Sequence, residues 1–438
     1  MRRVVAAVAS VVLGAVLLTG AAATPAPNPQ QSTDPTRAAE YWLDQYGIRE
    51  AWKTTRGAGQ KIAIIDTGIA RGPVEFTGAV AGGTDVSGVG AADGRTPVGA
   101  VDANHGSWVA SLAAARGTGD QTGMIGVAPD AQLLSISVGF GSVTSKPFTE
   151  QIVDAIHWAV DQGATVINMS LTTNTLDWDP SWDEAFQYAF DHDVVIVVAA
   201  GNRGSGTSRV GAPATIPGVL AVGGVDPSGT ASNDASTQGI TIGLSAPSER
   251  LLGVSADGTL VQWNGTSGAA PIVSGIAALV RAAHPDLNAD NVLNRLIRTA
   301  KPAAGAAPGQ DKLYGYGLVD AAAAVSATGV PTVSANPLGD LAEWVRLYRR
   351  ANAPAPTGSP TAAPVDIPPL PPVESAPQAA SPLLPTRDSL LYGTLPLAGA
   401  TLAAIMITLG VSAAARRIRK ARTSREPSRI TNQESLPS

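Results

Sequence analysis

The sequence predicts an α/β domain, in which a mostly parallel sheet is flanked by helices, and one membrane-spanning helix near the C-terminus. Two observations lead to this prediction. Between residues 41 and 326, short β-branched runs alternate with helical patterns, which is typical of parallel sheets with helices on both faces. Residues 395–415 then form an uninterrupted apolar segment that is long enough to cross a bilayer.

The elements of the domain follow from where apolar residues recur along the chain. Short β-branched runs predict strands, and longer amphipathic patterns predict helices. The strands are expected at 61–65, 133–138, 165–169 and 194–199, and the helices at 107–115, 148–161 and 182–191. A further amphipathic stretch at 338–350 is expected either to pack on the domain or to lie at a membrane surface.

Composition excludes several classes of function. Hydrophobic residues make up 44% of the chain, which is enough for a large core, and the net charge of −5 argues against nucleic acid as a partner. The sequence has no cysteine, which rules out disulfides, a thiolate nucleophile and a cysteine-ligated metal. It has 4 histidines, so a histidine-dependent reaction has few candidate residues. We expect no cofactor.

The N-terminus has the pattern of a secretory signal over residues 1–23. Arg2 and Arg3 precede an apolar run at 4–18, and cleavage is expected after Ala23. The alternative is a first transmembrane helix, but the run is short for the roughly 20 residues that a span needs. Residues 24–40, rich in Pro, Gln and Thr, are expected to form an extended arm before the domain at 41–326.

The C-terminal part predicts a membrane anchor. Residues 327–388 form a Pro-rich linker, and a transmembrane helix is expected at 389–415. The tail at 416–438 begins with clustered Arg and Lys, which predicts that it stays in the cytoplasm. A buried core helix is the alternative. We therefore expect a single-pass protein of the cell membrane, with the domain extracytoplasmic and the C-terminus cytoplasmic.

Asp66 and His105 are the first two candidate catalytic residues. Asp66 ends an apolar strand and precedes Thr-Gly, although for this segment taken alone a carboxylate that caps a turn is the better interpretation. An aspartic protease would need a second such motif, which the sequence lacks. His105 opens a helix beside Gly106, which suits a general base, but taken alone an incidental surface histidine is the better interpretation. His157, His192 and His284 are interpreted as structural.

Ser267 is the third candidate. It lies in a small-residue turn at the start of an apolar helix, where a nucleophilic hydroxyl would be helped by the positive end of the helix dipole. The alternative is an ordinary serine or threonine helix cap. The esterase motif G-x-S-x-G is absent, because position 269 is Ala, so an α/β-hydrolase is disfavoured.

The segments IAIIDTG, HGSWVAS and GTSGAAPIVSGIAALV, in this order, resemble the Asp, His and Ser motifs of the subtilisin-like serine proteases. The resemblance covers nearly all of 45–326 and implies a three-layer fold and hydrolysis of protein or peptide substrates. It makes Ser267 the nucleophile, His105 the general base and Asp66 the group that orients the imidazole. Asn202 is the implied oxyanion donor. The implied walls of the specificity pocket are Ser170, Leu171, Ala200 and Gly201.

Three departures from the family pattern bear on the site. Trp108 replaces a second histidine that is not catalytic in the family. Gly268 replaces a larger residue, so we expect looser packing beside the nucleophile. Thr172 and Thr173 replace small residues, so we expect a narrower cleft and restricted specificity. Many relatives bind structural calcium, but the sequence assigns no ligand role to the nearby carboxylates Asp85, Asp93 and Asp102.

The short arm, Pro-rich linker, single anchor and basic tail resemble the mycosins, the membrane-anchored subtilases of actinobacterial type VII secretion. Mycosins typically contain disulfides, and this chain has no cysteine. The resemblance implies a selective serine endopeptidase that cleaves through an acyl-enzyme and has the type VII membrane complex as a partner. Two alternatives are a structural scaffold of such a complex with dispensable activity and a general degradative protease tethered to the cell surface.

Overall fold

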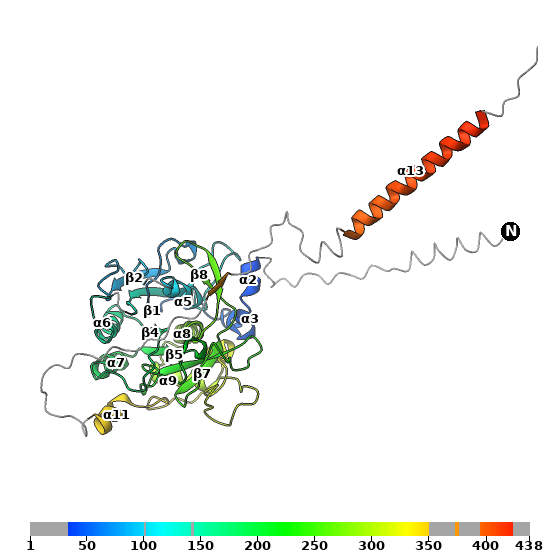
Figure 1. The fold of residues 1–438 in the computed structure, drawn as a ribbon. Coiled ribbons are helices and arrows are strands. Elements are labelled where there is room, and N and C mark those ends of the chain that lie inside the picture. The colour runs from blue at the N-terminus through cyan, green and yellow to red at the C-terminus, as the bar shows by residue number, and fades with distance from the viewer. Residues whose placement is uncertain (1–33, 100–101, 142–143, 350–372, 376–394, 424–438) are drawn as a thin grey trace, which may run out of the picture. The chain divides into compact units, whose positions relative to one another are not determined.

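The computed structural model describes residues 34–99, 102–141, 144–349, 373–375 and 395–423 (Figure 1). The chain divides into two compact units, Met1–Pro377 and Gln378–Ser438, which are described separately. The predicted signal at 1–23 and most of the linker and tail lie outside the described residues.

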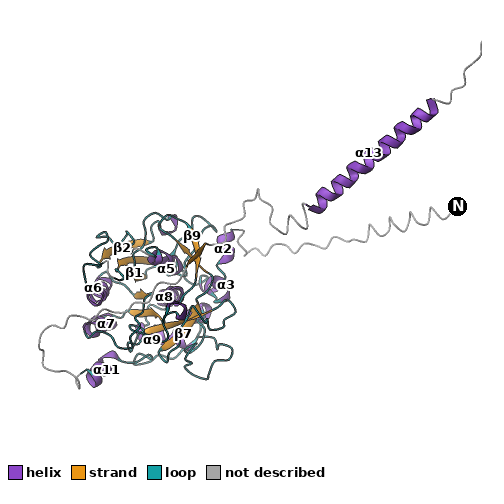
Figure 2. Ribbon diagram, in the orientation of Figure 1, coloured by secondary structure: helices purple, strands orange, loops and turns teal. Residues whose placement is uncertain are grey.

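The first unit is built around a seven-stranded sheet with the order β2-β3-β1-β4-β5-β6-β7, and each neighbouring pair is parallel (Figure 2). The strands are β1 (Lys61–Asp66), β2 (Val80–Asp85), β3 (Gln132–Ser137), β4 (Val166–Met169), β5 (Val195–Ala199), β6 (Leu220–Val225) and β7 (Ile242–Pro247). The predicted parallel α/β fold is confirmed.

Helices cover both faces of this sheet. The longer helices are α5 (His105–Ala114), α6 (Phe148–Asp161), α7 (Ser181–Asp191), α8 (Thr266–Ala283) and α9 (Ala289–Arg298). Side chains alternate across a strand, so Ile62 and Ile64 of β1 enter a core with α5, α8 and α9, while Ala63 and Ile65 enter a second core with α6 and α7. The result is three layers, helix–sheet–helix.

A small antiparallel sheet lies beside the large one. It consists of β8 (Leu251–Val254), β9 (Leu260–Trp263) and β10 (Val373–Ser375), in the order β10-β9-β8. β9 leads directly into α8, and β10 belongs to the predicted linker. The pairing of β10 places Val373 opposite Trp263.

Shorter elements complete this unit. They are α2 (Pro35–Ala39), α3 (Trp42–Gln45), α4 (Ile48–Ala51), the 3₁₀ turns η1 (Val74–Phe76) and η2 (Arg203–Ser205), α10 (Ala321–Ser326) and α11 (Leu341–Tyr348). The expected extended arm therefore ends in a helix, because the side chain of Asp34 accepts a hydrogen bond from the backbone N–H of Arg37 at 3.0 Å and caps it.

Of the two positions expected for the amphipathic stretch near residue 340, the structure shows the packed one. Trp344 of α11 lies against Trp178 with ring centroids 4.4 Å apart. Arg349 extends over both rings and donates a hydrogen bond to Asp183 at 2.6 Å. Packing thus continues past residue 326.

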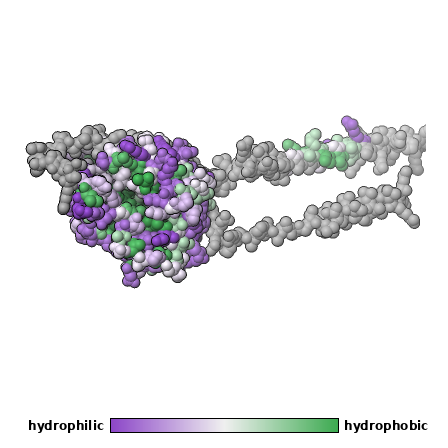
Figure 3. Space-filling view, turned by 90° about the horizontal axis from the view of Figure 1, so that it is seen from below, coloured by the Kyte–Doolittle hydropathy of each residue, from purple (hydrophilic) through white to green (hydrophobic). Residues whose placement is uncertain are grey.

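The second unit contains α13 (Leu395–Thr423), which includes the apolar run predicted as an anchor. Figure 3 shows this helix as a hydrophobic stretch followed by hydrophilic residues, whereas hydrophobic and hydrophilic patches are mixed on the visible face of the first unit. Among the described helices, α8 has the length and apolar composition of a membrane span, but 89% of it is buried in the core. The anchor stays a prediction.

Candidate active site

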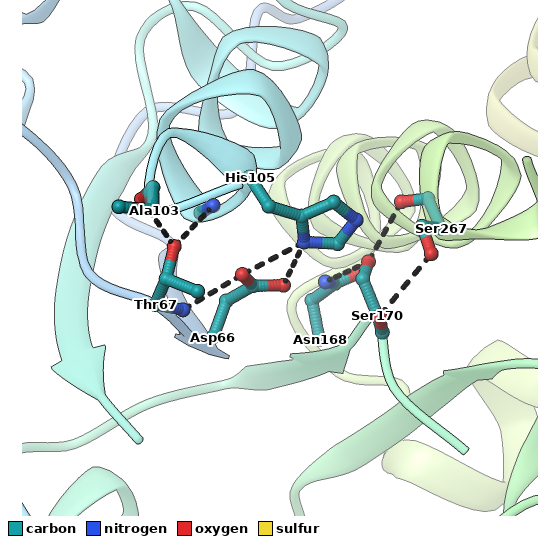
Figure 4. Close-up of polar contacts among 8 residues, drawn as sticks. Asp66, Thr67, Ala103, His105, Asn168, Ser170 and Ser267 are labelled. Carbon is teal, nitrogen blue, oxygen red and sulfur yellow. Dashed lines mark hydrogen bonds and ion pairs between the residues drawn. The ribbon is translucent and has the colours of Figure 1, made fainter. Parts of the chain in front are cut away.

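The three candidate catalytic residues lie at the ends of three elements that meet. Asp66 is the last residue of β1, His105 is the first residue of α5, and Ser267 is the second residue of α8. The carboxyl ends of parallel strands share one edge of the sheet, where α/β proteins place functional groups. The fold thereby brings Asp66 together with His105, which is 39 positions further along the chain, and with Ser267, which is 201 positions further (Figure 4).

Asp66 and His105 form a buried hydrogen-bonded pair. Nδ1 of His105 lies 2.8 Å from one carboxylate oxygen of Asp66 and 3.0 Å from the other, and both side chains are fully buried. The backbone N–H of Thr67 donates to Asp66 at 2.7 Å. The acceptor carboxylate fixes the proton on Nδ1 and leaves Nε2 free to act as a base.

Thr67 connects the end of β1 to the start of α5. Its hydroxyl donates to the carbonyl of Ala103 at 2.7 Å and accepts from the N–H of Gly106 at 2.8 Å. A Cβ on Gly106 would lie 2.6 Å from the carbonyl oxygen of Gly68, so only glycine lets the helix approach the strand this closely. The first turn of α5 is thereby held where His105 can reach Asp66.

Ser267 lies at the amino end of α8, where backbone N–H groups and the helix dipole favour developing negative charge. In this structure its hydroxyl donates to the carbonyl of Ser170 at 3.2 Å. Nε2 of His105 is buried and has no hydrogen-bond partner among the described residues. Figure 4 shows the imidazole between Asp66 and Ser267, so the one unsatisfied ring nitrogen is on the side of the serine.

Asn202 is held by the residue that precedes Ser267. Its Oδ1 accepts hydrogen bonds from the backbone N–H of Thr266 at 2.8 Å and from the Thr266 hydroxyl at 3.0 Å. A backbone N–H can only donate, so the amide must present its oxygen to Thr266 and its Nδ2 donor elsewhere. Gly201 adds a third bond, from its N–H to the Thr266 hydroxyl at 3.0 Å.

The candidate pocket residues are held by a second set of hydrogen bonds. The Ser170 hydroxyl donates to the carbonyl of Ser267 at 2.7 Å and accepts from Asn168 at 3.0 Å. Leu171 and Ala200 are buried in the core shared with α6 and α7, so only their backbone can border a cleft. A Cβ on Gly201 would lie 3.0 Å from the methyl group of Thr172. The Thr172 side chain therefore lies against the Gly201 backbone.

The expectation of looser packing beside the nucleophile was wrong. A Cβ built on Gly268 would overlap with Cδ1 of Leu251, and it would lie 3.1 Å from Cδ1 of Leu112 and 3.3 Å from Cη2 of Trp263. The space that a larger residue would fill is already occupied by side chains of β8, β9 and α5. Glycine at this position reflects dense packing, because neighbours far apart in the sequence converge on it.

The carboxylates named as calcium candidates do not gather into a site. Within the described ranges, no group of three or more His, Cys, Asp or Glu side chains is placed to hold a metal ion. Asp85 accepts hydrogen bonds from Ser87, Gly88, Gly90 and Ser137. Burial raises the pKa of Asp85, but these four bonds outweigh it and leave the pKa below its ordinary value. Asp93 pairs with Arg71.

The other three histidines lie outside the triad and have other partners. His157 stacks on Tyr188 with ring centroids 4.7 Å apart, His192 bonds the carbonyl of Tyr188 at 2.7 Å, and His284 bonds the carbonyl of Val325 at 2.7 Å. Their interpretation as structural residues agrees with these contacts.

Sequence reasoning missed the residues that hold the site together. Thr67, Thr266 and Trp263 were not singled out, although both threonines are next to a candidate catalytic residue in the sequence. Adjacency in the motif was the available signal for the two threonines. No signal existed for Trp263, because its contact with His105 crosses about 160 residues of chain and depends on the fold.

Comparisons with known proteins identify the family of the chain. The family model for the Subtilase family matches residues 57–317. Mycosin-4 of Mycobacterium tuberculosis is 36% identical over 328 residues, covering 65% of this chain and 68% of the relative. Subtilisin DY of Bacillus licheniformis is 37% identical over 276 residues, covering 61% of this chain and 92% of the relative.

Solved structures give the same result. The crystal structure of MycP1 with the N-terminal propeptide removed has a TM-score of 0.56 and 32% identity, covering 67% of this chain and 99% of that one. The MycP3 protease from the type VII (ESX-3) secretion system has a TM-score of 0.55 and 34% identity, covering 66% and 88%. The chain therefore belongs to the subtilase family of serine endopeptidases, and within that family it is similar to the mycosins.

Proposed function

We propose that this subtilase is anchored in the cell membrane, cleaves selected peptide bonds outside the cytoplasm and works with a type VII secretion complex. The observation that carries the catalytic assignment is the buried Asp66–His105 pair, whose free Nε2 is on the side of Ser267. This pairing leaves a buried ring nitrogen without a hydrogen-bond partner, which lowers the stability of the folded state. It suits a general base, because Nε2 is available to accept the proton of a hydroxyl group.

The proposed reaction runs through an acyl-enzyme. Ser267 Oγ attacks the carbonyl carbon of the scissile bond while His105 Nε2 accepts its proton, and Asp66 stabilises the imidazolium. The carbonyl oxygen becomes an oxyanion that receives hydrogen bonds from Asn202 Nδ2 and the backbone N–H of Ser267. His105 then protonates the leaving amine. Water attacks the acyl-enzyme while His105 accepts its proton, and His105 returns a proton to Ser267 Oγ as the ester bond breaks and the acid product leaves.

A fluorophosphonate probe tests this assignment, because only an activated serine reacts with it. We expect the wild-type chain to be labelled and the Ser267→Ala chain to stay unlabelled. Ser245→Ala is the matched control: Ser245 is also fully buried, but its hydroxyl donates to the carbonyl of Leu313 in another part of the fold. Labelling of Ser267→Ala at the wild-type rate would show that another residue is the nucleophile.

The proposed selectivity rests on the cleft wall. Thr172 and Thr173 are buried, and the methyl group of Thr172 lies against the Gly201 backbone, so the Thr172 side chain takes up space beside the candidate pocket. Cleavage of a peptide library at a few sequences supports a selective enzyme. Broad digestion of denatured casein supports the alternative of a general degradative protease.

The proposed anchor rests on α13. This helix of 29 residues contains the 395–415 run, and its large apolar side chains are exposed in the structure: Leu402, Ile405, Met406, Ile407, Leu409 and Val411. Exposed apolar side chains in such a run are stable in lipid and unfavourable in water. The chain has no cysteine, so single cysteines report topology cleanly.

A membrane-impermeant maleimide applied to intact cells should label Ala304→Cys, an exposed position in the protease domain, and should not label Ser428→Cys in the tail. Permeabilised cells serve as the control, since both positions should then react. Labelling of the tail in intact cells would contradict the topology.

A scaffold role is the second candidate, because a solved relative, the serine protease MycP1, is described as an essential component of the type VII (ESX-1) secretion system. Cells carrying Ser267→Ala separate the two roles. If secretion persists in those cells and stops when the whole chain is deleted, the scaffold role is supported. Loss of secretion in both strains supports the protease role.

A further inference from the structure

Two tryptophans pack against the catalytic histidine. The ring of Trp263 lies 5.5 Å from that of His105 at an interplanar angle of 72°, and the ring of Trp108 lies 6.2 Å away at 67°. The two indoles also contact each other at 5.8 Å. His105 is thus held between a carboxylate at Nδ1 and aromatic rings at its side, in the edge-to-face geometry that aromatic pairs prefer.

Both indoles are fixed by hydrogen bonds to β8 or to the residue that follows it. Trp263 Nε1 donates to the carbonyl of Leu252 at 3.1 Å, and Trp108 Nε1 donates to the hydroxyl of Ser255 at 2.9 Å. The Trp108 side chain packs against Gly253. A Cβ built on Gly253 would lie 2.6 Å from the Cβ of Trp108. Neither indole can shift without breaking a hydrogen bond or displacing β8.

Burial decides how these residues can act. Trp263 is 1% exposed and Trp108 is 2% exposed, so neither can contact a peptide substrate. The absence of a side chain on Gly268 leaves room for Trp263, because a Cβ there would lie 3.3 Å from the indole. The glycine beside the nucleophile and the tryptophan beside the base are therefore parts of one packing arrangement.

We propose that Trp263, supported by Trp108, is a positioning residue for His105. The bonds to Asp66 fix one ring nitrogen but leave the imidazole free to pivot about it. The indoles block that motion and keep Nε2 directed at Ser267. This proposal rests on the proposed function, because the position of Nε2 matters only if His105 is the base.

The test compares Trp263→Leu with a matched control, Trp182→Leu. Trp182 is also 1% exposed, and its Nε1 also donates to a backbone carbonyl, that of Thr149 at 3.0 Å, but it lies on α7 across the sheet. Both changes remove one buried indole and one hydrogen bond, so both should lower the melting temperature. Only the first removes a contact of His105.

We measure the rate of labelling by a fluorophosphonate probe as a function of its concentration. For Trp263→Leu the maximal rate should fall about tenfold, with the half-saturating concentration changed less than about twofold, because small misplacements of a catalytic group cost rate rather than binding. Trp263→Phe, which keeps an aromatic ring, should recover most of the rate. The Trp182→Leu chain should label at the wild-type rate.

Equal rates for the Trp263→Leu and wild-type chains, or equal losses for the Trp263→Leu and Trp182→Leu chains, would overturn the proposal. If Trp263→Leu does not fold, Trp108→Leu replaces it, with an expected loss of about threefold because that ring is farther from His105.

A second measurement does not need an active serine. In the full-length Ser267→Ala chain with ¹³C-labelled histidine, the His105 resonance should shift when Trp263 is changed to Leu and stay in place when Trp182 is changed. If the wild-type chain never reacts with the probe but this shift is seen, the proposed function fails and the positioning contact stands. An unshifted resonance overturns the positioning contact itself.

Discussion

The two halves of the active site differ in how completely they are assembled. On the β1 and α5 side, His105 is bonded to both carboxylate oxygens of Asp66 and packed against two indoles. On the α8 side, Asn202 is fixed by Thr266, but the Ser267 hydroxyl makes one long bond, 3.2 Å, to a backbone carbonyl. The residues proposed as the base and the oxyanion donor are therefore preorganised, whereas the proposed nucleophile has to change its hydrogen-bond partner to react.

This difference indicates which groups should contribute most to stabilising the transition state. A preorganised donor needs no rearrangement when charge develops, so it stabilises the transition state at no further cost. A hydroxyl that exchanges one weak hydrogen bond for another loses little, since such bonds contribute on the order of 1 kcal/mol each. Changes to the fixed groups should therefore cost more than changes around the mobile one.

The largest effect is expected for Asn202→Ala. The loss of Nδ2 should lower turnover by about 10²–10³-fold, the range measured for the equivalent change in subtilisin. With a peptide substrate, the half-saturating concentration should hardly change, because the donor acts on the oxyanion. Asn202→Ala with turnover near the wild-type value would show that the α8 side does not depend on a preorganised donor.

A smaller effect is expected for Thr266→Val, which keeps the shape of the side chain but removes its hydroxyl. Asn202 Oδ1 keeps the backbone donor of Thr266 and loses the hydroxyl, while Gly201 N–H loses its acceptor. We expect turnover to fall about tenfold, corresponding to about 1.4 kcal/mol. Thr266→Ser keeps the hydroxyl and should stay within about threefold of wild type. Equal losses in both variants would contradict the orienting role.

Gly268→Ala tests the dense packing around Gly268, where α8 meets β8, β9 and α5. A Cβ at this position would overlap with Leu251, so the free energy of unfolding should fall by about 1–3 kcal/mol, which is typical of overpacked cores. Chemical denaturation measures it in the Ser267→Ala background, where self-cleavage is prevented. The double variant Gly268→Ala/Leu251→Val should recover part of the loss. No recovery would mean that Leu251 is not the limiting neighbour.

The smallest effect concerns Glu40, which lies apart from both halves of the site and is fully buried beside Arg37. Burial raises its pKa well above the ordinary value, and the backbone N–H of Ile125 and Arg37 only partly oppose this. Because the folded-state pKa is raised, the stability that Glu40 contributes is complete below its unfolded pKa. That stability is lost as the pH rises through the folded pKa.

Glu40→Gln should therefore gain melting temperature relative to wild type as the pH is raised above about 4.5, the unperturbed value for a glutamate. The difference between the two melting temperatures isolates this residue from all other titrating groups. A difference that is constant with pH would show that Glu40 does not titrate abnormally. Profiles of activity against pH should be corrected for the loss of stability caused by Glu40 before any fall in activity is assigned to the titration of the catalytic groups.

Much of the fold was predictable because periodicity is a local signal. The predicted helix at 148–161 matches α6 residue for residue, and the strands expected near 61, 133, 165 and 194 occur within one or two residues of those positions. The helical end of the N-terminal arm was not predicted. Asp34 caps this helix and Pro35 occupies its first turn, and such local start signals are not visible in the composition of the arm.

The site was predictable only in its named residues. Asp66, His105, Ser267 and Asn202 come from motif order, and the structure brings them together. The expected looseness at Gly268 was wrong because the sequence shows a missing side chain but not the neighbours that occupy the space. The contact of Trp263 with His105 could not be predicted for the same reason, because the two residues are distant in the sequence.

The sequence by itself therefore determined the parallel α/β architecture, the family and the candidates for the reactive groups, since each depends on local pattern or on motifs in order. The tertiary structure alone decided the density around Gly268, the orientation of the Asn202 amide and the packing of two indoles on His105. These depend on contacts between residues that lie tens to hundreds of positions apart. Such contacts exist only once the sheet and α8 have placed those residues side by side.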